Sequence, residues 1–204
     1  MKLYYSPASP FVRKVMVCAT LRGLNKKIEH LPSAAGPVKR DRTIVAQNPS
    51  GKVPTMLLDD GTPIYDSRVI CEFLDSIGRA PKLFPAKGAA RWSALTLASL
   101  ADEALDAAIL CRYEAVIRPK SKQWPDWAKG QMEKITGTVD ELEKTWLKHL
   151  RGSLDIGTIT AGCLLGYLDF RFGDYDWRKT HPKLAAWYKK FAKTPAMAAT
   201  APKV

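Results

Sequence analysis

The sequence predicts a small mixed α/β unit followed by an all-helical unit. Strand patterns and helix patterns alternate within the first 78 residues, whereas no strand pattern appears after residue 86. Between them lies a Pro-rich connector, residues 79–85, which reads RAPKLFP. We therefore expect two domains, at residues 1–78 and 86–204, each with its own hydrophobic core.

The first domain is predicted to follow the order β-α-β and then β-β-α. We expect strands at residues 2–5, 28–31, 54–58 and 63–65, and helices at residues 10–21, 41–46 and 67–77. Residues 59–61 read DDG, which is a hairpin signal between the last two strands, and Gly78 suits the C-cap of the last helix. This order is typical of a compact mixed sheet of the thioredoxin type.

The second domain contains long runs of helix formers with apolar residues spaced three and four apart. We expect helices at residues 89–113, 131–150, 159–171 and 182–192. Thr158 is expected to cap the third of these helices. Ala161 stands where an acidic residue would complete a capping box, so the box is incomplete.

Composition and charge are those of an ordinary globular protein, with 46% hydrophobic and 25% charged residues. No apolar run approaches the ~18 residues that a membrane span needs, and the first residues lack a secretory signal, so we expect a cytoplasmic protein without a membrane partner. The net charge of +12 divides into +5 for residues 1–80 and +7 for residues 81–204. Because the excess is not gathered into one arm, we expect steering of anionic ligands instead of nucleic-acid binding.

The four cysteines lie singly in apolar helical patterns, without a C-x-x-C motif or a nearby histidine. They are predicted to be buried, reduced thiols, and no metal site is expected.

The most informative motif is residues 48–54, which read NPSGKVP, followed by residues 65–68, which read YDSR. It places the Val53-Pro54 unit opposite an acid and a hydroxyl at a strand-to-helix corner. Ser9 precedes Pro10 at the start of the first predicted helix, where a serine is a favourable N-cap. A hydroxyl that caps a helix still has its own proton to donate outward.

These motifs and this order of elements resemble bacterial glutathione S-transferases. Residues 166–171 (GYLDFR) and 181–188 (HPKLAAWY) extend the resemblance over essentially the whole chain. It implies a thioredoxin-like glutathione-binding domain, an all-helical domain that contributes the electrophile pocket, and a homodimer. Glutathione is then the co-substrate, and no metal is needed.

The resemblance implies that Ser9 stabilises the thiolate of bound glutathione. A thiol held at this helix N-terminus meets the positive end of the helix dipole and the serine donor together. Some classes of the family use a tyrosine at the end of the first strand, so Tyr5 is the alternative, although a strand tyrosine more often packs.

The remaining glutathione contacts are also implied by the resemblance. A cis Val53-Pro54 bond pairs with the cysteinyl backbone, and Ser67 and Asp66 receive the γ-glutamyl carboxylate and ammonium groups. The alternative for this pair is that Asp66 is a plain helix cap and Ser67 a first-turn residue. Candidates for the glycyl carboxylate are the basic residues Lys52, Lys39 and Arg40.

The electrophile pocket is expected to contain Phe11, Arg112 and Tyr113, with a salt bridge inside the helical bundle as the alternative for Arg112. The predicted function is conjugation of glutathione to small hydrophobic electrophiles, as in detoxification. Two alternatives are a non-catalytic protein-binding module and a glutathione-dependent reductase or peroxidase. The reductase is disfavoured because Ser9, which cannot form a mixed disulfide, stands where such enzymes keep a cysteine.

Overall fold

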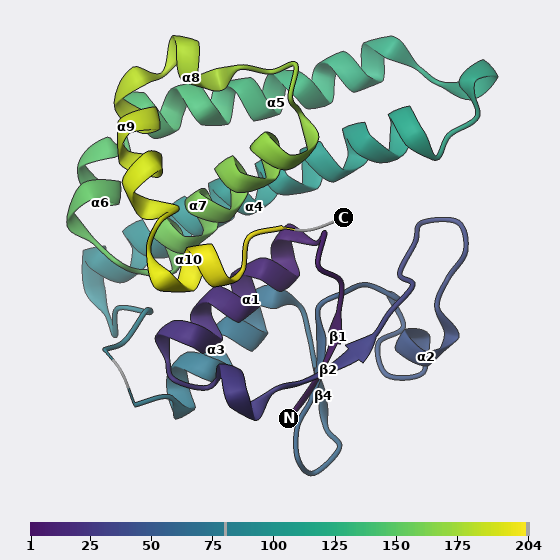
Figure 1. Ribbon diagram of the computed structural model, residues 1–204, viewed down its shortest axis with the longest axis vertical. Helices are drawn as coiled ribbons and strands as arrows, with labels where there is room; N and C mark the ends of the chain where they lie inside the picture. Colours follow the sequence, from purple (N-terminus) through teal and green to yellow (C-terminus); the bar gives the residue numbers. More distant parts are fainter. Residues whose placement is uncertain (80, 203–204) are drawn as a thin grey trace. The chain divides into compact units, whose positions relative to one another are not determined.

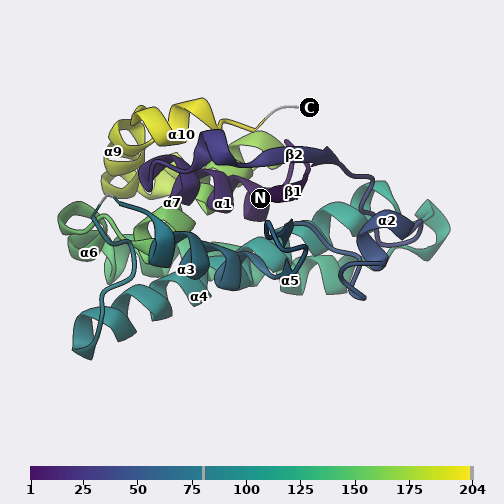
Figure 2. The same cartoon turned by 90° about the horizontal axis from the view of Figure 1, so that it is seen from below.

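The computed structural model describes residues 1–79 and 81–202 and separates into two compact units. The first unit comprises residues 1–85 and the C-terminal segment from Pro195, and the second, helical unit comprises residues 86–194. The predicted domains differ from these units at the C-terminal end. Helix α10 (Pro195–Ala199) packs on α1 (Pro10–Leu21), as Figures 1 and 2 show, because the Arg13 guanidinium donates to the Met197 carbonyl at 3.1 Å.

A four-stranded mixed sheet forms the centre of the first unit and confirms the thioredoxin-like prediction. Its strands are β1 (Lys2–Tyr5), β2 (Glu29–Pro32), β3 (Thr55–Leu57) and β4 (Pro63–Ile64), in the spatial order β2-β1-β3-β4. β1 pairs with β2 in parallel, and the two remaining pairs are antiparallel. The parallel pair requires a crossover, which α1 supplies together with a 3₁₀ turn at Asn25–Lys27.

Helices α1 and α3 (Ser67–Ile77) pack together, and a short helix, α2 (Arg42–Val45), precedes β3. The packed faces follow from helical spacing, since Val15 of α1 and Ile70 and Leu74 of α3 have no exposed surface. As predicted, α3 ends at the C-cap Gly78.

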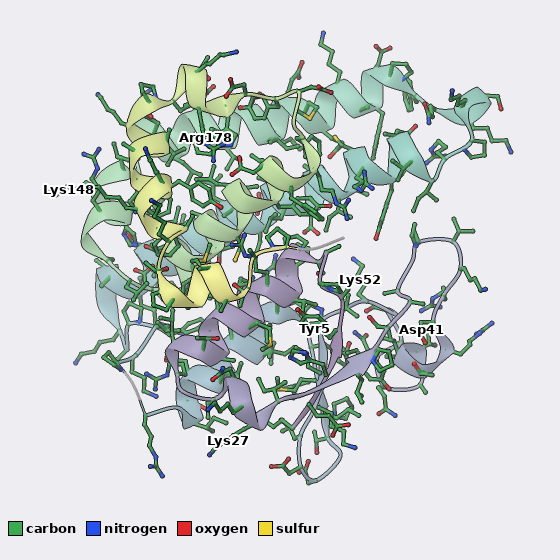
Figure 3. The ribbon with its side chains drawn as sticks, in the orientation of Figure 1. Tyr5, Lys27, Asp41, Lys52, Lys148 and Arg178 are labelled. Atoms are coloured by element: carbon green, nitrogen blue, oxygen red, sulfur yellow. The ribbon has the colours of Figure 1, made fainter. Side chains whose placement is uncertain are left out.

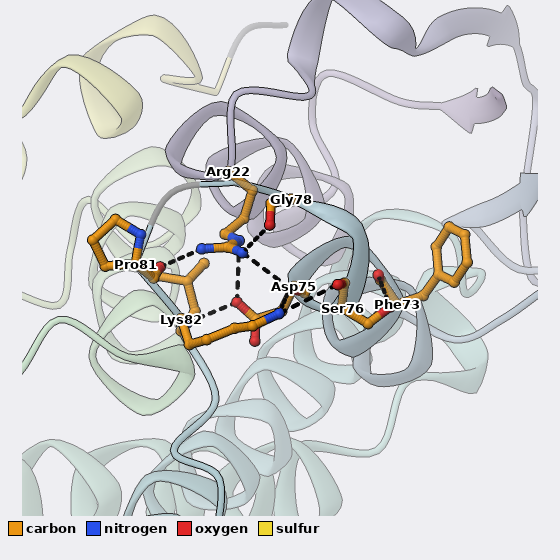
Figure 4. A network of polar contacts seen from close by, with 8 residues as sticks. Arg22, Phe73, Asp75, Ser76, Gly78, Pro81 and Lys82 are labelled. Carbon is orange, nitrogen blue, oxygen red and sulfur yellow. Dashed lines mark hydrogen bonds and ion pairs between the residues drawn. The ribbon is translucent and has the colours of Figure 1, made fainter.

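A buried arginine joins the ends of α1 and α3 (Figure 4). Arg22 forms an ion pair with Asp75 and donates to the carbonyl oxygens of Gly78, at 2.5 Å, and Pro81, at 2.5 Å. The Asp75 carboxylate also accepts the Leu83 N–H at 2.7 Å, and the Asp75 carbonyl oxygen accepts hydrogen bonds from Arg22 and Lys82. A methyl group on Gly78 would lie 2.7 Å from the Arg22 side chain, so only glycine leaves room for this network.

The second unit is entirely helical in its described residues. Its helices are α4 (Gly88–Val116), α5 (Pro125–Lys144), α6 (Leu147–Gly152), α7 (Ile156–Arg171), α8 (Trp177–Thr180) and α9 (Pro182–Phe191), with a 3₁₀ turn at Lys120–Lys122. Helix α7 is the centre of this unit, since every residue from Ile156 to Leu168 is buried. Gly157 allows α7 to approach α4 closely, because a methyl group there would lie 2.7 Å from the Ala94 carbonyl oxygen.

Two sequence expectations for this unit are wrong. Residues 131–150 do not form one helix: α5 ends at Lys144 and α6 begins at Leu147, so that Leu147 and Leu150 turn into the core. Thr158 is not the cap of α7. The N-cap is Asp155, whose carboxylate accepts the Thr158 N–H at 3.0 Å, and the Thr158 hydroxyl donates to the Ser153 carbonyl at 2.9 Å.

Within residues 1–79 and 81–202, no helix combines the length and apolarity that a bilayer span requires.

Candidate glutathione-binding site

The strand registers bring the predicted glutathione-binding residues to one end of the sheet. Tyr4 of β1 lies opposite Thr55 of β3, and Met56 lies opposite Ile64 of β4. The end of β1, the start of β3 and the end of β4 therefore share one sheet edge. Ser9, Val53-Pro54 and Asp66-Ser67 are attached directly or by a short turn to these three strand ends.

Ser9 is the N-cap of α1, as its sequence position predicts. Its Oγ accepts the Val12 N–H at 3.3 Å, and Pro10 occupies the first helical position. The turn that delivers it is closed by the Ser9 N–H, which donates to the Ser6 carbonyl at 3.1 Å. Within residues 1–79 and 81–202, no acceptor receives the Ser9 hydroxyl proton. A half-buried donor is thus left at the positive end of a twelve-residue helix.

Tyr5 lies at the end of β1, and its ring stacks on His30 of β2 (Figure 3 labels Tyr5). The two ring centroids are 4.1 Å apart and the planes differ by 5°. Its neighbour Tyr4 is buried and donates its hydroxyl to the Thr43 carbonyl at 3.2 Å. Both strand tyrosines thus have packing roles.

The Val53-Pro54 peptide bond is cis, as the resemblance implied. In the described part of the chain, neither the N–H nor the C=O of Val53 has a hydrogen-bond partner. Pro54 is buried and Val53 half-buried, so this backbone unit is held firmly on one side. The Val53 backbone groups are available to pair with an extended peptide, in the manner of an added strand.

A buried amide that the sequence analysis missed organises the loop before the cis bond. Asn48 is 2% exposed and donates to the Thr55 hydroxyl at 2.9 Å, while its carbonyl oxygen accepts the Ser50 N–H at 3.0 Å. Gly51 has a φ of 65°, a region that favours glycine. The asparagine two residues before Ser50 is a known turn signal and would have identified this support.

Asp66 and Ser67 begin α3. The Asp66 carboxylate accepts the Arg68 N–H at 2.9 Å, so this residue is the helix N-cap, and the Tyr65-Asp66 peptide bond is also cis. Asp66 is exposed, whereas Ser67 is 2% exposed at the first helical position. The capping interpretation of Asp66 is thus confirmed, and its remaining carboxylate oxygen faces no partner among the described residues.

Three basic candidates for the glycyl carboxylate, Lys39, Arg40 and Lys52, are all exposed. Arg40 donates to the Pro49 carbonyl and so ties the basic loop to the loop before the cis bond. Asp41, labelled with Lys52 in Figure 3, caps α2 by accepting the Thr43 N–H at 2.9 Å. Hydrogen bonds from the Ala34 N–H and the Thr43 hydroxyl lower the pKa of Asp41 to about 2.

The proposed electrophile residues belong to different units. Phe11 is half-buried in α1, where the Lys14 ammonium lies 5.7 Å from its ring centroid. Arg112 and Tyr113 are half-buried in α4 and interact electrostatically with Tyr167 of α7. Burial raises the pKa of both Tyr113 and Tyr167. The salt bridge considered for Arg112 is not formed with any described residue.

A surface depression and the arrangement of possible metal ligands complete the description of candidate sites. A depression of about 560 Å³ on the helical unit lies beside the Asp169–Arg178 ion pair and α9, and contains none of the predicted site residues. Over residues 1–79 and 81–202, no group of three or more His, Cys, Asp or Glu side chains is arranged to hold a metal ion.

Comparison with known proteins agrees with this geometry. Residues 8–77 match the model of the glutathione S-transferase N-terminal domain, and residues 125–190 match that of the C-terminal domain. An uncharacterised GST-like protein of Escherichia coli K12, YibF, is 30% identical over 99% of this chain and 98% of its own length.

Two solved structures of a glutathione transferase family member from Pseudomonas fluorescens Pf-5 are more similar still. The first, with bound glutathione, has a TM-score of 0.97 and 44% identity, and the similarity covers 100% of this chain and 99% of that one. The second, with bound S-(propanoic acid)-glutathione, has a TM-score of 0.93 and 43% identity, with 100% of both chains covered.

Proposed function

Because the chain belongs to the glutathione S-transferase family, we propose that it binds glutathione and activates its thiol for attack on small electrophiles. The observation that carries this proposal is the Ser9 hydroxyl, which caps α1 and keeps its own proton available at the sheet edge that also holds the cis Val53-Pro54 unit.

Glutathione binding rests on three groups that suit its three parts. The Val53 backbone pairs with the cysteinyl unit, and the N-terminus of α3 with Ser67 receives the γ-glutamyl carboxylate. The exposed Asp66 oxygen faces the α-ammonium group. Lys52, Lys39 or Arg40 binds the glycyl carboxylate. The bound glutathione of the 44% identical Pseudomonas protein supports this assignment of ligand.

The chemical step needs a thiolate. A free thiol with a pKa of ~8.5 is only a few per cent ionised at neutral pH, and lowering that pKa by ~2 units requires ~2.7 kcal/mol of differential stabilisation. A charge-assisted hydrogen bond from Ser9 contributes about 1.5–3 kcal/mol, and the N-terminus of α1 contributes about 0.3–1 kcal/mol. Their sum, about 1.8–4 kcal/mol, spans the ~2.7 kcal/mol that the shift requires. The thiolate then forms a carbon–sulfur bond while the leaving group departs with its electron pair.

A serine-to-alanine exchange tests this role. We expect Ser9→Ala to be retained on immobilised glutathione and to lose about ten- to hundredfold in kcat with 1-chloro-2,4-dinitrobenzene, because one charge-assisted donor is removed. The pH profile of kcat/KM should shift to higher pH in parallel. Tyr5→Phe is the matched control, since it removes a hydroxyl at the end of β1 and keeps the ring that stacks on His30.

The outcomes separate the alternatives. If Tyr5→Phe loses turnover and Ser9→Ala keeps the turnover of the wild type, Tyr5 is the residue that stabilises the thiolate. Retention of the wild type on glutathione without turnover of any electrophile would indicate a binding module. Absence of retention would contradict the proposal as a whole.

We also propose a homodimer in the cytoplasm. Val69 on α3 and Trp92 on α4 are 50% and 66% exposed, and large apolar side chains of this kind are typical of association surfaces. All four cysteines are buried thiols, which suits a reducing compartment. Sedimentation of the wild type and of Trp92→Glu should give a dimer and a weakened dimer, respectively.

A further inference from the structure

Helices α4 and α7 run side by side in the same direction within the helical unit (Figure 1). Their register is fixed near their starts, where Gly157 meets Ala94. Arg112 lies eighteen residues after Ala94, which is five full turns at ~3.6 residues per turn. Arg112 therefore lies on the face of α4 that packs on α7.

Arg171 occupies the matching position on α7. It lies fourteen residues after Gly157, just under four turns, and so returns to within about 40° of the face that packs on α4. At ~1.5 Å per residue, Arg171 is ~21 Å along α7 and Arg112 is ~27 Å along α4. The ~6 Å offset is within the reach of an arginine side chain. Helix register thus brings both guanidinium groups to the same end of the pair.

Electrostatic interactions agree with this placement. Burial, followed by the charge of Arg112, lowers the pKa of Arg171. Both arginines also act on Tyr167. Two half-buried positive charges are thus held close together, which is unfavourable unless an anion offsets their repulsion.

The protein supplies no such anion in the part of the chain that the structure describes. There, neither Arg112 nor Arg171 has a carboxylate partner or a hydrogen bond. The guanidinium carbon of Arg171 lies 3.9 Å from the centroid of the Phe170 ring. Arg178 in the same unit differs, since two of its nitrogens contact the Asp169 carboxylate at 2.5 and 2.6 Å.

Two phenols complete the cluster. Tyr113 follows Arg112 on α4, and Tyr167 lies one turn before Arg171 on α7. Because burial raises the pKa of both, they keep their protons at neutral pH and remain hydrogen-bond donors. The cluster therefore offers two cations and two neutral donors.

We propose that Arg112 and Arg171 bind an anionic group of the second substrate, so that this transferase acts on electrophiles that carry a carboxylate. This inference rests on the proposed function and specifies its substrate class. Guanidinium groups bind carboxylates with charge-assisted, often bidentate hydrogen bonds, which neutral aromatic electrophiles cannot exploit.

The test compares glutathione conjugates that differ in one charge. S-(2-carboxyethyl)- and S-(4-carboxybenzyl)glutathione are titrated calorimetrically beside their neutral carboxamides. The wild type should bind at least one acid about ten- to hundredfold more tightly than its amide. In Arg112→Met and Arg171→Met this preference, taken as the ratio of acid to amide affinity within each variant, should fall below about threefold, while Tm stays close to wild type. Arg171→Lys should retain part of the preference.

Lys148→Met is the matched control, because it removes an exposed positive charge from α6 of the same unit (Lys148 is labelled in Figure 3). It should keep the full preference. Equal affinity for acid and amide at both spacer lengths, or a preference that survives in both arginine variants, would overturn the inference while glutathione binding, and with it the proposed function, stands.

A second titration distinguishes failure of the proposed function from failure of the proposed anion site. If the wild type binds neither glutathione nor its conjugates, 4-nitrobenzoate is titrated alone and followed by protein NMR. If 4-nitrobenzoate binds and its binding requires Arg112 and Arg171, the anion-site proposal stands and the transferase proposal is contradicted. No binding would reject both.

Discussion

The guanidinium group of Arg22 and the carboxylate of Asp75 form an ion pair inside the first unit, with 3.2 Å between Nε and Oδ1. Their side chains are 0% and 5% exposed. Arg22 belongs to the C-cap of α1 and Asp75 to the last turns of α3, so the pair joins the two helices that cover the sheet. If either partner is removed, the remaining charge stays buried and is not solvated by water.

We expect Arg22→Met to destabilise the protein by about 3–5 kcal/mol, because it leaves the Asp75 charge and the carbonyl oxygens of Gly78 and Pro81 without their donor. Urea denaturation followed by circular dichroism measures the change. The double variant Arg22→Met/Asp75→Asn should cost less than the sum of the two single variants. Additive costs would mean that the pair is not coupled.

Gly157→Ala should destabilise the helical unit by about 1–3 kcal/mol, since its new methyl group would clash with the Ala94 carbonyl and Leu97. Gly137→Ala is the matched control. It lies inside α5 with nothing within 4 Å of the new methyl, and should stabilise by about 0.5–1 kcal/mol. Thermal denaturation of both variants gives the comparison, and shifts of the same sign would argue against the close contact of α4 and α7.

Asp155→Ala should cost about 1–2 kcal/mol, because the carboxylate caps α7 and also contacts His149 Nε2 at 2.8 Å. Thr158→Val removes only the hydrogen bond to Ser153 and should cost about 0.5–1.5 kcal/mol. Asp155→Asn retains a capping oxygen and should recover most of the loss. A larger effect at Thr158 than at Asp155, in equilibrium unfolding, would restore the threonine as the dominant cap.

Acidification should loosen the segment around α2. Hydrogen bonds from Ala34 and Thr43 lower the pKa of Asp41 to about 2, below its ordinary value. A depressed carboxyl pKa means that its stabilising contribution is complete above about pH 4 and is lost as the pH falls toward 2. Amide hydrogen exchange at Ala34 and Thr43 should accelerate over that range, and Asp41→Asn should show the fast exchange already at pH 5. Rates that are independent of pH, after correction for intrinsic exchange, would contradict this expectation.

Elements whose limits depend on neighbouring residues were predicted closely from the sequence. β1, α1 and α3 have the expected bounds, because Ser9-Pro10, Asp66 and Gly78 are local start and stop signals. The candidate glutathione-binding residues at the sheet edge were predicted from the same local patterns combined with the family resemblance.

Features that depend on distant contacts were not predicted. The break between α5 and α6 has no proline or glycine and follows from the burial of Leu147 and Leu150. Likewise, Arg171 could not be assigned to the neighbourhood of Arg112 from spacing, since the two residues meet only through the packing of α4 on α7. The register that Gly157 sets is a property of two helices together.

The contact between Arg13 and Met197 has a consequence for biosynthesis. The Arg13 guanidinium group cannot form this hydrogen bond during translation until Met197, 184 residues later in the sequence, has been added. Until then α1 lacks one of its neighbours, even after the whole helical unit has been translated. Maturation of the first unit is therefore completed only after Met197 has been translated, and a nascent chain stalled before Pro195 should remain sensitive to protease at α1.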